Sequence, residues 1–248
     1  MKKTGVSQEG LKLIACVTML IDHVGAVLVY SWYLAESRAI GMSYEPLWNF
    51  YTLFRIIGRI SFPIYCFLLV EGYSHTRNFR KYCGRMAVCM LLSEIPFDLA
   101  FSGMPVDATY TNVMATLLLG LVMMACMDKL SGVWQFAVIV PFCLLAEFLR
   151  TDYAANGIMI IAMFALTRNH PQANWMRLMA SVFLFWFGGE VTFGTIRIPM
   201  ELFALLGYIP IFLYRGEKRG NSRAVQWIFY LFYPVHLLLL WVIQNAIW

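Results

Sequence analysis

Long apolar runs constrain this 248-residue chain more than any other feature of its sequence. The runs are about as long as a membrane helix, and they show none of the apolar–polar alternation that marks the strands of a membrane barrel. Only helices and closed barrels span lipid, so we expect an all-α, polytopic bundle of transmembrane helices. The composition agrees, because 60% of the residues are hydrophobic and only 13% are charged. This balance excludes a soluble globular enzyme, a disordered chain and a nucleic-acid-binding module.

About nine segments are apolar enough to cross a membrane, at about 20 residues for each crossing. They cover residues 11–34, 50–73, 82–103, 111–128, 133–149, 153–167, 175–192, 197–214 and 224–246. The fifth and sixth segments nearly touch, so a tight hairpin or a re-entrant pair is an alternative there. Without an internal repeat or a low-complexity segment, the sequence predicts a single integral-membrane domain over residues 1–248.

The distribution of lysine and arginine predicts the orientation of these spans. With the N-terminus in the cytoplasm, fourteen of the 19 basic residues fall on the inside. They are Lys2, Lys3, Lys12, Arg77, Arg80, Lys81, Arg85, Lys129, Arg168, Arg177, Arg215, Lys218, Arg219 and Arg223. An odd number of spans then places the C-terminus on the extracytoplasmic side.

Ionisable residues inside spans are costly and usually mark function. Here they gather between the midplane and the outer surface, which predicts one outward-facing polar cavity. The set comprises Asp22, His23, Arg55, Arg59, Glu94, Asp98, Asn112, Arg150, Asp152, Glu190, Arg197, Glu201 and His236. Two arginines one turn apart on one helix, Arg55 and Arg59, can neutralise Glu94 and Asp98 on another. The alternative for several of these residues is a buried ion-pair lattice that only locks the helices together.

His23 is the best candidate for proton transfer near neutral pH. Asp22 is its neighbour, and Lys12 lies eleven residues earlier at the cytoplasmic end of the same predicted helix. Eleven residues of helix rise about 16 Å, which is about the reach of an extended pantetheine arm. An acyl-coenzyme A could therefore hold its phosphates at Lys12 and place its thioester beside His23. Arg77, Arg80 and Lys81 could also bind phosphate, although simple positive-inside topology is the favoured explanation for most of the basic residues at this end.

Other chemistries find little support in the sequence. It contains no Walker A, GxSxG or HExxH motif. The six cysteines have no metal-site spacing and are expected to be free core thiols. We therefore expect no metal.

Several stretches together resemble the TraX family. They are LKLIACVTMLIDHVGAVL, FRIIGRISFPIYCFLLVEGYSHTRNFRKYCGRM, LLSEIPFDLAF, TDYAANG and FYPVHLLLL. TraX-family proteins are associated with conjugal transfer and N-terminal acetylation of pilin. They are similar to the acyltransferase-three superfamily and, more distantly, to heparan-glucosaminide N-acetyltransferase. Acyltransferase-three proteins carry a basic residue, ten intervening residues and a histidine in the first helix, as Lys12 and His23 do, although their basic residue is more commonly arginine.

The resemblance implies an acetyl-CoA-dependent transmembrane acetyltransferase in the bacterial cytoplasmic membrane. His23 would be the catalytic base, oriented by Asp22 or another carboxylate, and Lys12 would lie near the coenzyme. From the residues themselves we expect Arg55 or Arg59 to stabilise the oxyanion, and Glu94 and Asp98 to position the arginines or the acceptor. His236 would line the cavity or satisfy polar groups freed by Pro234. The partners would be membrane lipids and an acceptor amine or hydroxyl, either a pilin N-terminus or a surface glycan.

Two alternatives come from other functional classes. Buried acidic, basic and histidine residues are also found in proton-coupled transporters, although these often contain repeats. A non-catalytic membrane subunit of a secretion or conjugation machine is the second alternative. It predicts that His23 is dispensable.

Overall fold

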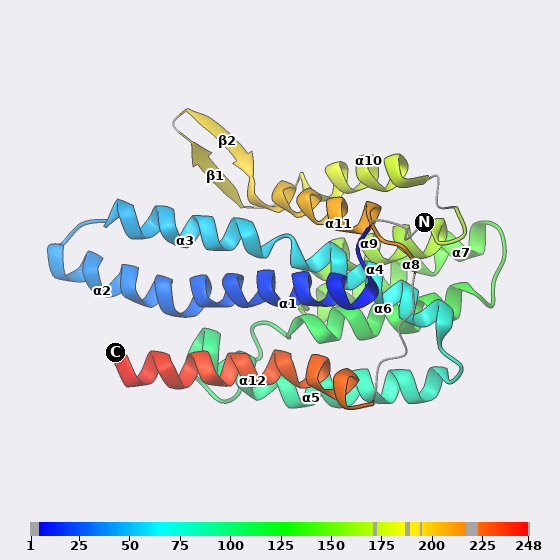
Figure 1. Ribbon diagram of the computed structural model, residues 1–248, viewed down its shortest axis with the longest axis horizontal. Helices are drawn as coiled ribbons and strands as arrows, with labels where there is room; N and C mark the ends of the chain where they lie inside the picture. The colour runs from blue at the N-terminus through cyan, green and yellow to red at the C-terminus, as the bar shows by residue number, and fades with distance from the viewer. Residues whose placement is uncertain (1–4, 171–172, 187–188, 194, 217–222, 248) are drawn as a thin grey trace.

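The computed structural model of the chain describes residues 5–170, 173–186, 189–193, 195–216 and 223–247. These residues are mostly helical, with one short β-hairpin (Figure 1). The first part contains α1 Gln8–Val24, η1 Gly25–Val29, α2 Tyr30–Ile40, α3 Glu45–Gly58, α4 Ser61–His75, α5 Phe79–Ser102 and α6 Val113–Met127. The second part contains α7 Val133–Ala137, α8 Ile139–Phe148, α9 Ala154–Thr167, α10 Asn174–Phe185, β1 Glu190–Phe193, β2 Ile196–Pro199, η3 Met200–Gly207, α11 Tyr208–Phe212 and α12 Arg223–Ile247.

The first helix is longer than the predicted segment 11–34. It runs without interruption from Gln8 to Ile40 through α1, the π-helical turn η1 and α2. The Ser7 hydroxyl caps its start by accepting a hydrogen bond from the Gly10 amide at 3.1 Å. Its end lies at Gly41, whose φ of 71° is accessible to glycine without steric cost.

The second span is one long helix with a break in its middle, between α3 and α4. Pro63 lies one turn after Arg59 and has no N–H group to bond the Arg59 carbonyl. The Ser61 hydroxyl satisfies the neighbouring Gly58 carbonyl at 2.8 Å. The break therefore falls beside the two arginines that the sequence places in this span.

Three helical segments of the described residues are long and apolar enough to cross a membrane: Gln8–Ile40, Glu45–His75 and Trp227–Ile247. Four shorter apolar helical segments are Val113–Met127, Val133–Phe148, Ala154–Thr167 and Met200–Phe212. The chain thus has the apolar helices of a membrane protein. A helix or helix pair falls in each predicted segment, whereas nine full crossings stay a prediction.

The predicted helix over 175–192 is wrong in its second half. Helix α10 ends at Phe185, and residues from Glu190 onward form β1, which pairs antiparallel with β2. Residues 187 and 188 lie outside the described part of the chain. The hairpin projects from the helices in Figure 1, so the predicted seventh and eighth spans are both shorter than the apolar pattern suggests.

Helix α1 lies at the centre of the arrangement that positions the site. It packs against α3 and α4 on one side and against α12 on another, and α12 lies beside α5 (Figure 1). The start of α1 and the end of α12 lie toward opposite ends of the long axis in that view. The buried core includes Leu11, Ala15, Ile64, Leu121 and Leu237, all fully enclosed.

Candidate functional site

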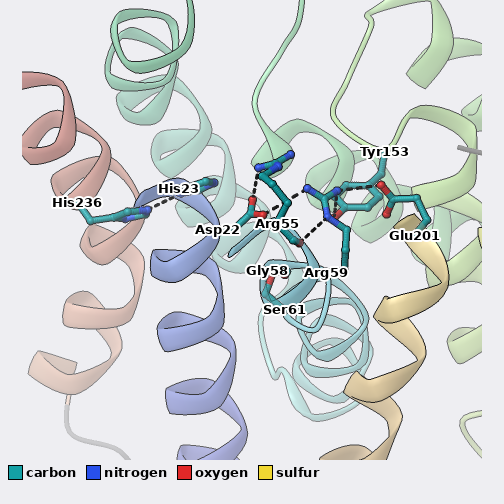
Figure 2. A network of polar contacts seen from close by, with 9 residues as sticks. All are labelled: Asp22, His23, Arg55, Gly58, Arg59, Ser61, Tyr153, Glu201 and His236. Atoms are coloured by element: carbon teal, nitrogen blue, oxygen red, sulfur yellow. Dashed lines mark hydrogen bonds and ion pairs between the residues drawn. The ribbon is translucent and has the colours of Figure 1, made fainter. Parts of the chain in front are cut away.

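Asp22 and His23 are neighbours in sequence but contact different helices. Successive residues of a helix point about 100° apart. Figure 2 shows the consequence: the Asp22 carboxylate meets arginines of the second span, whereas the His23 imidazole meets His236 of α12. Helix α1 therefore joins two separate polar clusters.

The first cluster is an ion-pair network around Asp22. The Arg55 guanidinium donates to Asp22 at 2.7 Å, and the Arg59 guanidinium lies 3.4 Å from the other carboxylate oxygen. Arg59 also pairs with Glu201 at 2.9 Å and donates to the Tyr153 hydroxyl at 3.3 Å. The Arg59 side chain is buried, so the network ties α1, the second span, η3 and the start of α9 together.

Gly58 makes this network possible. A Cβ atom at position 58 would overlap the Asp22 side chain, so only glycine lets α1 approach the end of α3 this closely. Arg59 follows as the C-cap of α3 and keeps helical backbone angles, and its Nε atom donates to the Arg55 carbonyl at 3.3 Å.

The second cluster is a pair of histidines. The Nδ1 atom of His23 lies 2.6 Å from the Nε2 atom of His236, and the two ring planes differ by only 7°. Both side chains are buried. The His23 ring also contacts the rings of Phe101 and Tyr233, at centroid distances of 5.7 Å and 5.9 Å.

A cavity of about 450 Å³, called the inner cavity below, extends from the start of α1 to Tyr233, whose ring contacts His23. Lys12, His75 and Arg85 line its start, and Tyr233 lines its deep part together with residues of α6. The Lys12 ammonium lies 5.2 Å from the centre of the Phe229 ring. The volume of the inner cavity falls in the usual range for small-molecule sites, about 300–1,000 Å³.

A second cavity of about 380 Å³, called the outer cavity below, lies at the end of α5 and the loop that follows it. Phe101 lines it together with Asp98, Asp107 and Asp152. Asp98 is buried and accepts a hydrogen bond from the Asp107 amide at 2.9 Å. Hydrogen bonds from the Thr109 hydroxyl and amide lower the pKa of the Asp107 carboxyl, so this loop keeps a negative charge.

The predicted pairing of Arg55 and Arg59 with Glu94 and Asp98 is wrong. The arginines pair with Asp22 and Glu201 instead. Glu94 accepts a hydrogen bond from the Asn112 side-chain amide, and Asn112 also caps α6 through the Met114 amide at 2.9 Å. The sequence showed charged stripes on both helices but not which stripes face each other.

The residues predicted to line one polar cavity are also divided among different surroundings. Among the described residues, Asp98 and Asp152 line the outer cavity, whereas Asp22, Arg55, Arg59, Glu94 and His23 line neither cavity. Glu190 and Arg197 lie on the exposed β-hairpin, 3.9 Å apart, and not in a cavity.

The basic residues that the sequence predicts to be cytoplasmic divide in a similar way. Lys12 lines the inner cavity, whereas Arg77, Arg80 and Lys81 are exposed and do not line it. The cavity has Arg85 and His75 in their place. Four residues of the predicted inside charge, Lys2, Lys3, Lys218 and Arg219, lie outside the described residues, as does the side chain of Arg223.

Three aromatic residues of the site were missed by sequence reasoning. Tyr233 and Phe101 contact His23, and Tyr153 stacks on Phe62 at a centroid distance of 3.6 Å. Tyr153 has a φ of 63°, unusual for a residue other than glycine. The only signal was that Tyr153 and Tyr233 lie within the TDYAANG and FYPVH stretches; a lone aromatic in an apolar run gives none.

Comparison with known proteins decides the family. The family model described as TraX protein matches residues 7–244. The chain belongs to the TraX family. The match contains both polar clusters and both cavities, so the whole site is part of the TraX-family region.

One curated relative of this TraX-family chain is the probable fimbrial assembly protein FimC, serogroup H1, of Dichelobacter nodosus. It is 28% identical over 243 residues, which cover 93% of this chain and 92% of the relative. No solved structure gives a significant match to the chain.

Proposed function

We propose that this TraX-family protein is a membrane-embedded acetyltransferase. It would move an acetyl group from cytoplasmic acetyl-CoA to an amine or hydroxyl on the extracytoplasmic side of the bacterial cytoplasmic membrane. The name of the Dichelobacter nodosus relative supports an acceptor connected with pilus assembly, such as a pilin N-terminus; a surface glycan is the other acceptor class.

The position of His23 between two cavities carries this proposal. Tyr233 contacts His23 and lines the inner cavity, and Phe101 contacts His23 and lines the outer one. A donor that entered from the cytoplasm and an acceptor that entered from outside would thus approach the same imidazole from two directions. Small movements of the two rings would open the imidazole to either cavity.

The inner cavity has the chemistry expected of a coenzyme A site. Its start carries the cationic side chains of Lys12 and Arg85, which suit phosphates, and its deeper walls are apolar, which suits a pantetheine arm. Lys12 and His23 lie on one continuous helix, about 16 Å apart along its axis. A thioester at the deep end would therefore lie close to the histidine pair.

The proposed reaction uses His23 as a general base. The acceptor nitrogen or oxygen attacks the thioester carbonyl carbon and forms a new bond, while its proton moves to the His23 imidazole. The tetrahedral intermediate then collapses with cleavage of the carbon–sulfur bond. The coenzyme leaves as a thiolate, which takes the proton back from His23 and becomes the free thiol.

The Asp22 network serves in this proposal to hold α1 in place. Because neither arginine lines a cavity among the described residues, we assign Arg55 and Arg59 a positioning role instead of the expected oxyanion role. Glu94 and Asn112 together hold the start of α6, whose first residues line the inner cavity.

The test uses purified full-length protein with acetyl-CoA. We expect thermal stabilisation by acetyl-CoA and slow hydrolysis or transfer, with turnover in His23→Ala reduced about a hundredfold or more. His170→Ala is the matched control, because His170 is exposed on a loop between α9 and α10. Absence of both stabilisation and turnover in the wild type would overturn the proposal. It would favour the transporter or the non-catalytic subunit.

A further inference from the structure

A backbone carbonyl determines the protonation of His236. The Nδ1 atom of His236 lies 2.6 Å from the Phe232 carbonyl oxygen. A carbonyl oxygen can only accept a hydrogen bond, so Nδ1 of His236 must carry the proton. In a neutral imidazole the other nitrogen, Nε2, then carries a lone pair.

The protonation of His236 in turn determines that of His23. The Nε2 atom of His236 faces Nδ1 of His23 at 2.6 Å. With Nε2 as the acceptor, Nδ1 of His23 is the donor and carries the proton. The nearly coplanar rings, 7° apart, direct the N–H bond of one along the lone pair of the other. Nε2 of a neutral His23 is therefore unprotonated.

We propose that His236 is a positioning residue that fixes His23 in the tautomer whose Nε2 can accept a proton. The fixed order is Phe232 carbonyl, His236, His23. The assignment of the tautomer stands on the contacts alone; its catalytic consequence rests on the function proposed above.

The hydrogen bond from His23 to His236 also stabilises His23 when it takes up a proton during the reaction. When Nε2 of His23 takes the proton of the acceptor, His23 becomes an imidazolium whose Nδ1–H already donates to His236. This hydrogen bond becomes charge-assisted and stronger, because its donor is now ionised. His236 keeps its own Nδ1 proton on the Phe232 carbonyl throughout, so it orients and stabilises without exchanging a proton with the substrate.

Nitrogen-15 NMR of histidine-labelled full-length protein tests the tautomer directly. His23 signals are assigned by their loss in His23→Ala. We expect His23 in the wild type to be neutral with its proton on Nδ1, and to lose this preference in His236→Leu, which has no acceptor. His236→Gln retains an acceptor oxygen and should restore the Nδ1 proton. Phe232→Leu is the matched control, since it changes the side chain beside His236 and leaves the carbonyl.

The transfer assay tests the consequence. We expect His236→Leu to lower the turnover number roughly ten- to a hundredfold, the usual cost of losing an orienting partner, with little change in the KM for acetyl-CoA. His236→Gln should regain most of the turnover, because its side chain can still accept the hydrogen bond from His23. If His236 served only in packing, the Gln variant would have no higher turnover than the Leu variant.

Two results would overturn the proposal that His236 fixes the tautomer of His23. One is a wild-type His23 with its proton on Nε2, and the other is a His236→Leu variant in which His23 keeps the proton on Nδ1. The wild-type measurement decides even if His236→Leu fails to fold. The NMR result does not depend on turnover. If His236 sets the tautomer of His23 but the protein transfers no acetyl group, only the proposed function is refuted.

Discussion

The side chain of Asp22 packs directly against the backbone of Gly58, with no room between them for a Cβ atom. This contact lets one carboxylate on α1 reach both Arg55 and Arg59. It also makes position 58 a sensitive point of the fold, since every other residue would push α1 away from the second span.

Gly58→Ala should therefore destabilise the protein. The added methyl group overpacks the contact, at a cost of about 1–3 kcal/mol, and displaces the carboxylate from its arginines. Thermal unfolding in detergent measures the effect. Gly84→Ala is the control, because Gly84 is exposed in α5 with no atom within 4 Å of the added carbon. It should leave stability unchanged or raise it by about 0.5–1 kcal/mol. Equal behaviour of the two variants would contradict the close contact.

Two ion pairs of equal length allow burial to be tested by itself. Asp22–Arg55 and Asp128–Arg168 both have a distance of 2.7 Å, but the Asp22 side chain is 13% exposed and that of Asp128 is 39% exposed. Asp22→Asn removes the carboxylate that pairs with the partly buried Arg55, and leaves Arg59 with Glu201 alone. It should cost about 3 kcal/mol, the low end for a buried pair. Asp128→Asn should cost about 1 kcal/mol or less. Chemical unfolding of the two variants compares the costs, and a larger loss in Asp128→Asn would refute the network.

Lys12→Ala should weaken acetyl-CoA binding more than turnover. A charge-assisted hydrogen bond to phosphate contributes about 1.5–3 kcal/mol, so the Kd should rise roughly tenfold or more. Calorimetry on purified protein gives the affinity, and saturating acetyl-CoA gives the turnover. Arg80→Ala tests mere loss of positive charge, since Arg80 is exposed and does not line the inner cavity. Similar losses in both variants would place the phosphates elsewhere.

The C-terminus should lie on the extracytoplasmic side. Most basic residues fall in segments that an odd number of spans would place inside, and α1 begins and α12 ends toward opposite ends of the molecule (Figure 1). A C-terminal fusion to a reporter that fluoresces only in the cytoplasm should stay dark, and alkaline phosphatase at the same position should be active. A bright fluorescent fusion would require an even number of spans.

The helical fold was largely predictable because long apolar runs indicate the segments that are removed from water. The prediction failed where hydropathy does not determine the type of secondary structure. Residues 175–192 are apolar enough for one helix, yet the chain leaves α10 after Phe185 and forms a β-hairpin. Hydropathy does not distinguish a helix from a strand, and the local turn residues carry that information instead.

The sequence named His23 and His236 as candidate residues but did not predict that their side chains are in contact. His23 follows from its depth in the first span and its spacing from Lys12. Its partner could not be found this way, because His236 lies 213 positions away and the choice between it and Asp22 depends on how α1 is rotated. Pairing the arginines with Asp22 instead of Glu94 is likewise decided by tertiary packing, here by Gly58.

The π-helical turn η1 begins at Gly25, two residues after His23. It divides the first helix into α1, which contributes Asp22 and His23 to the two polar clusters, and α2, which begins at Tyr30. Removing one residue from the turn would rotate α2 by about 100° and shift it by about 1.5 Å relative to α1. The length of this stretch is thus under tighter constraint than its composition. Substitutions at exposed positions can be absorbed locally, whereas an insertion or deletion would change the register between the part of the helix that carries Asp22 and His23 and the part that begins at Tyr30.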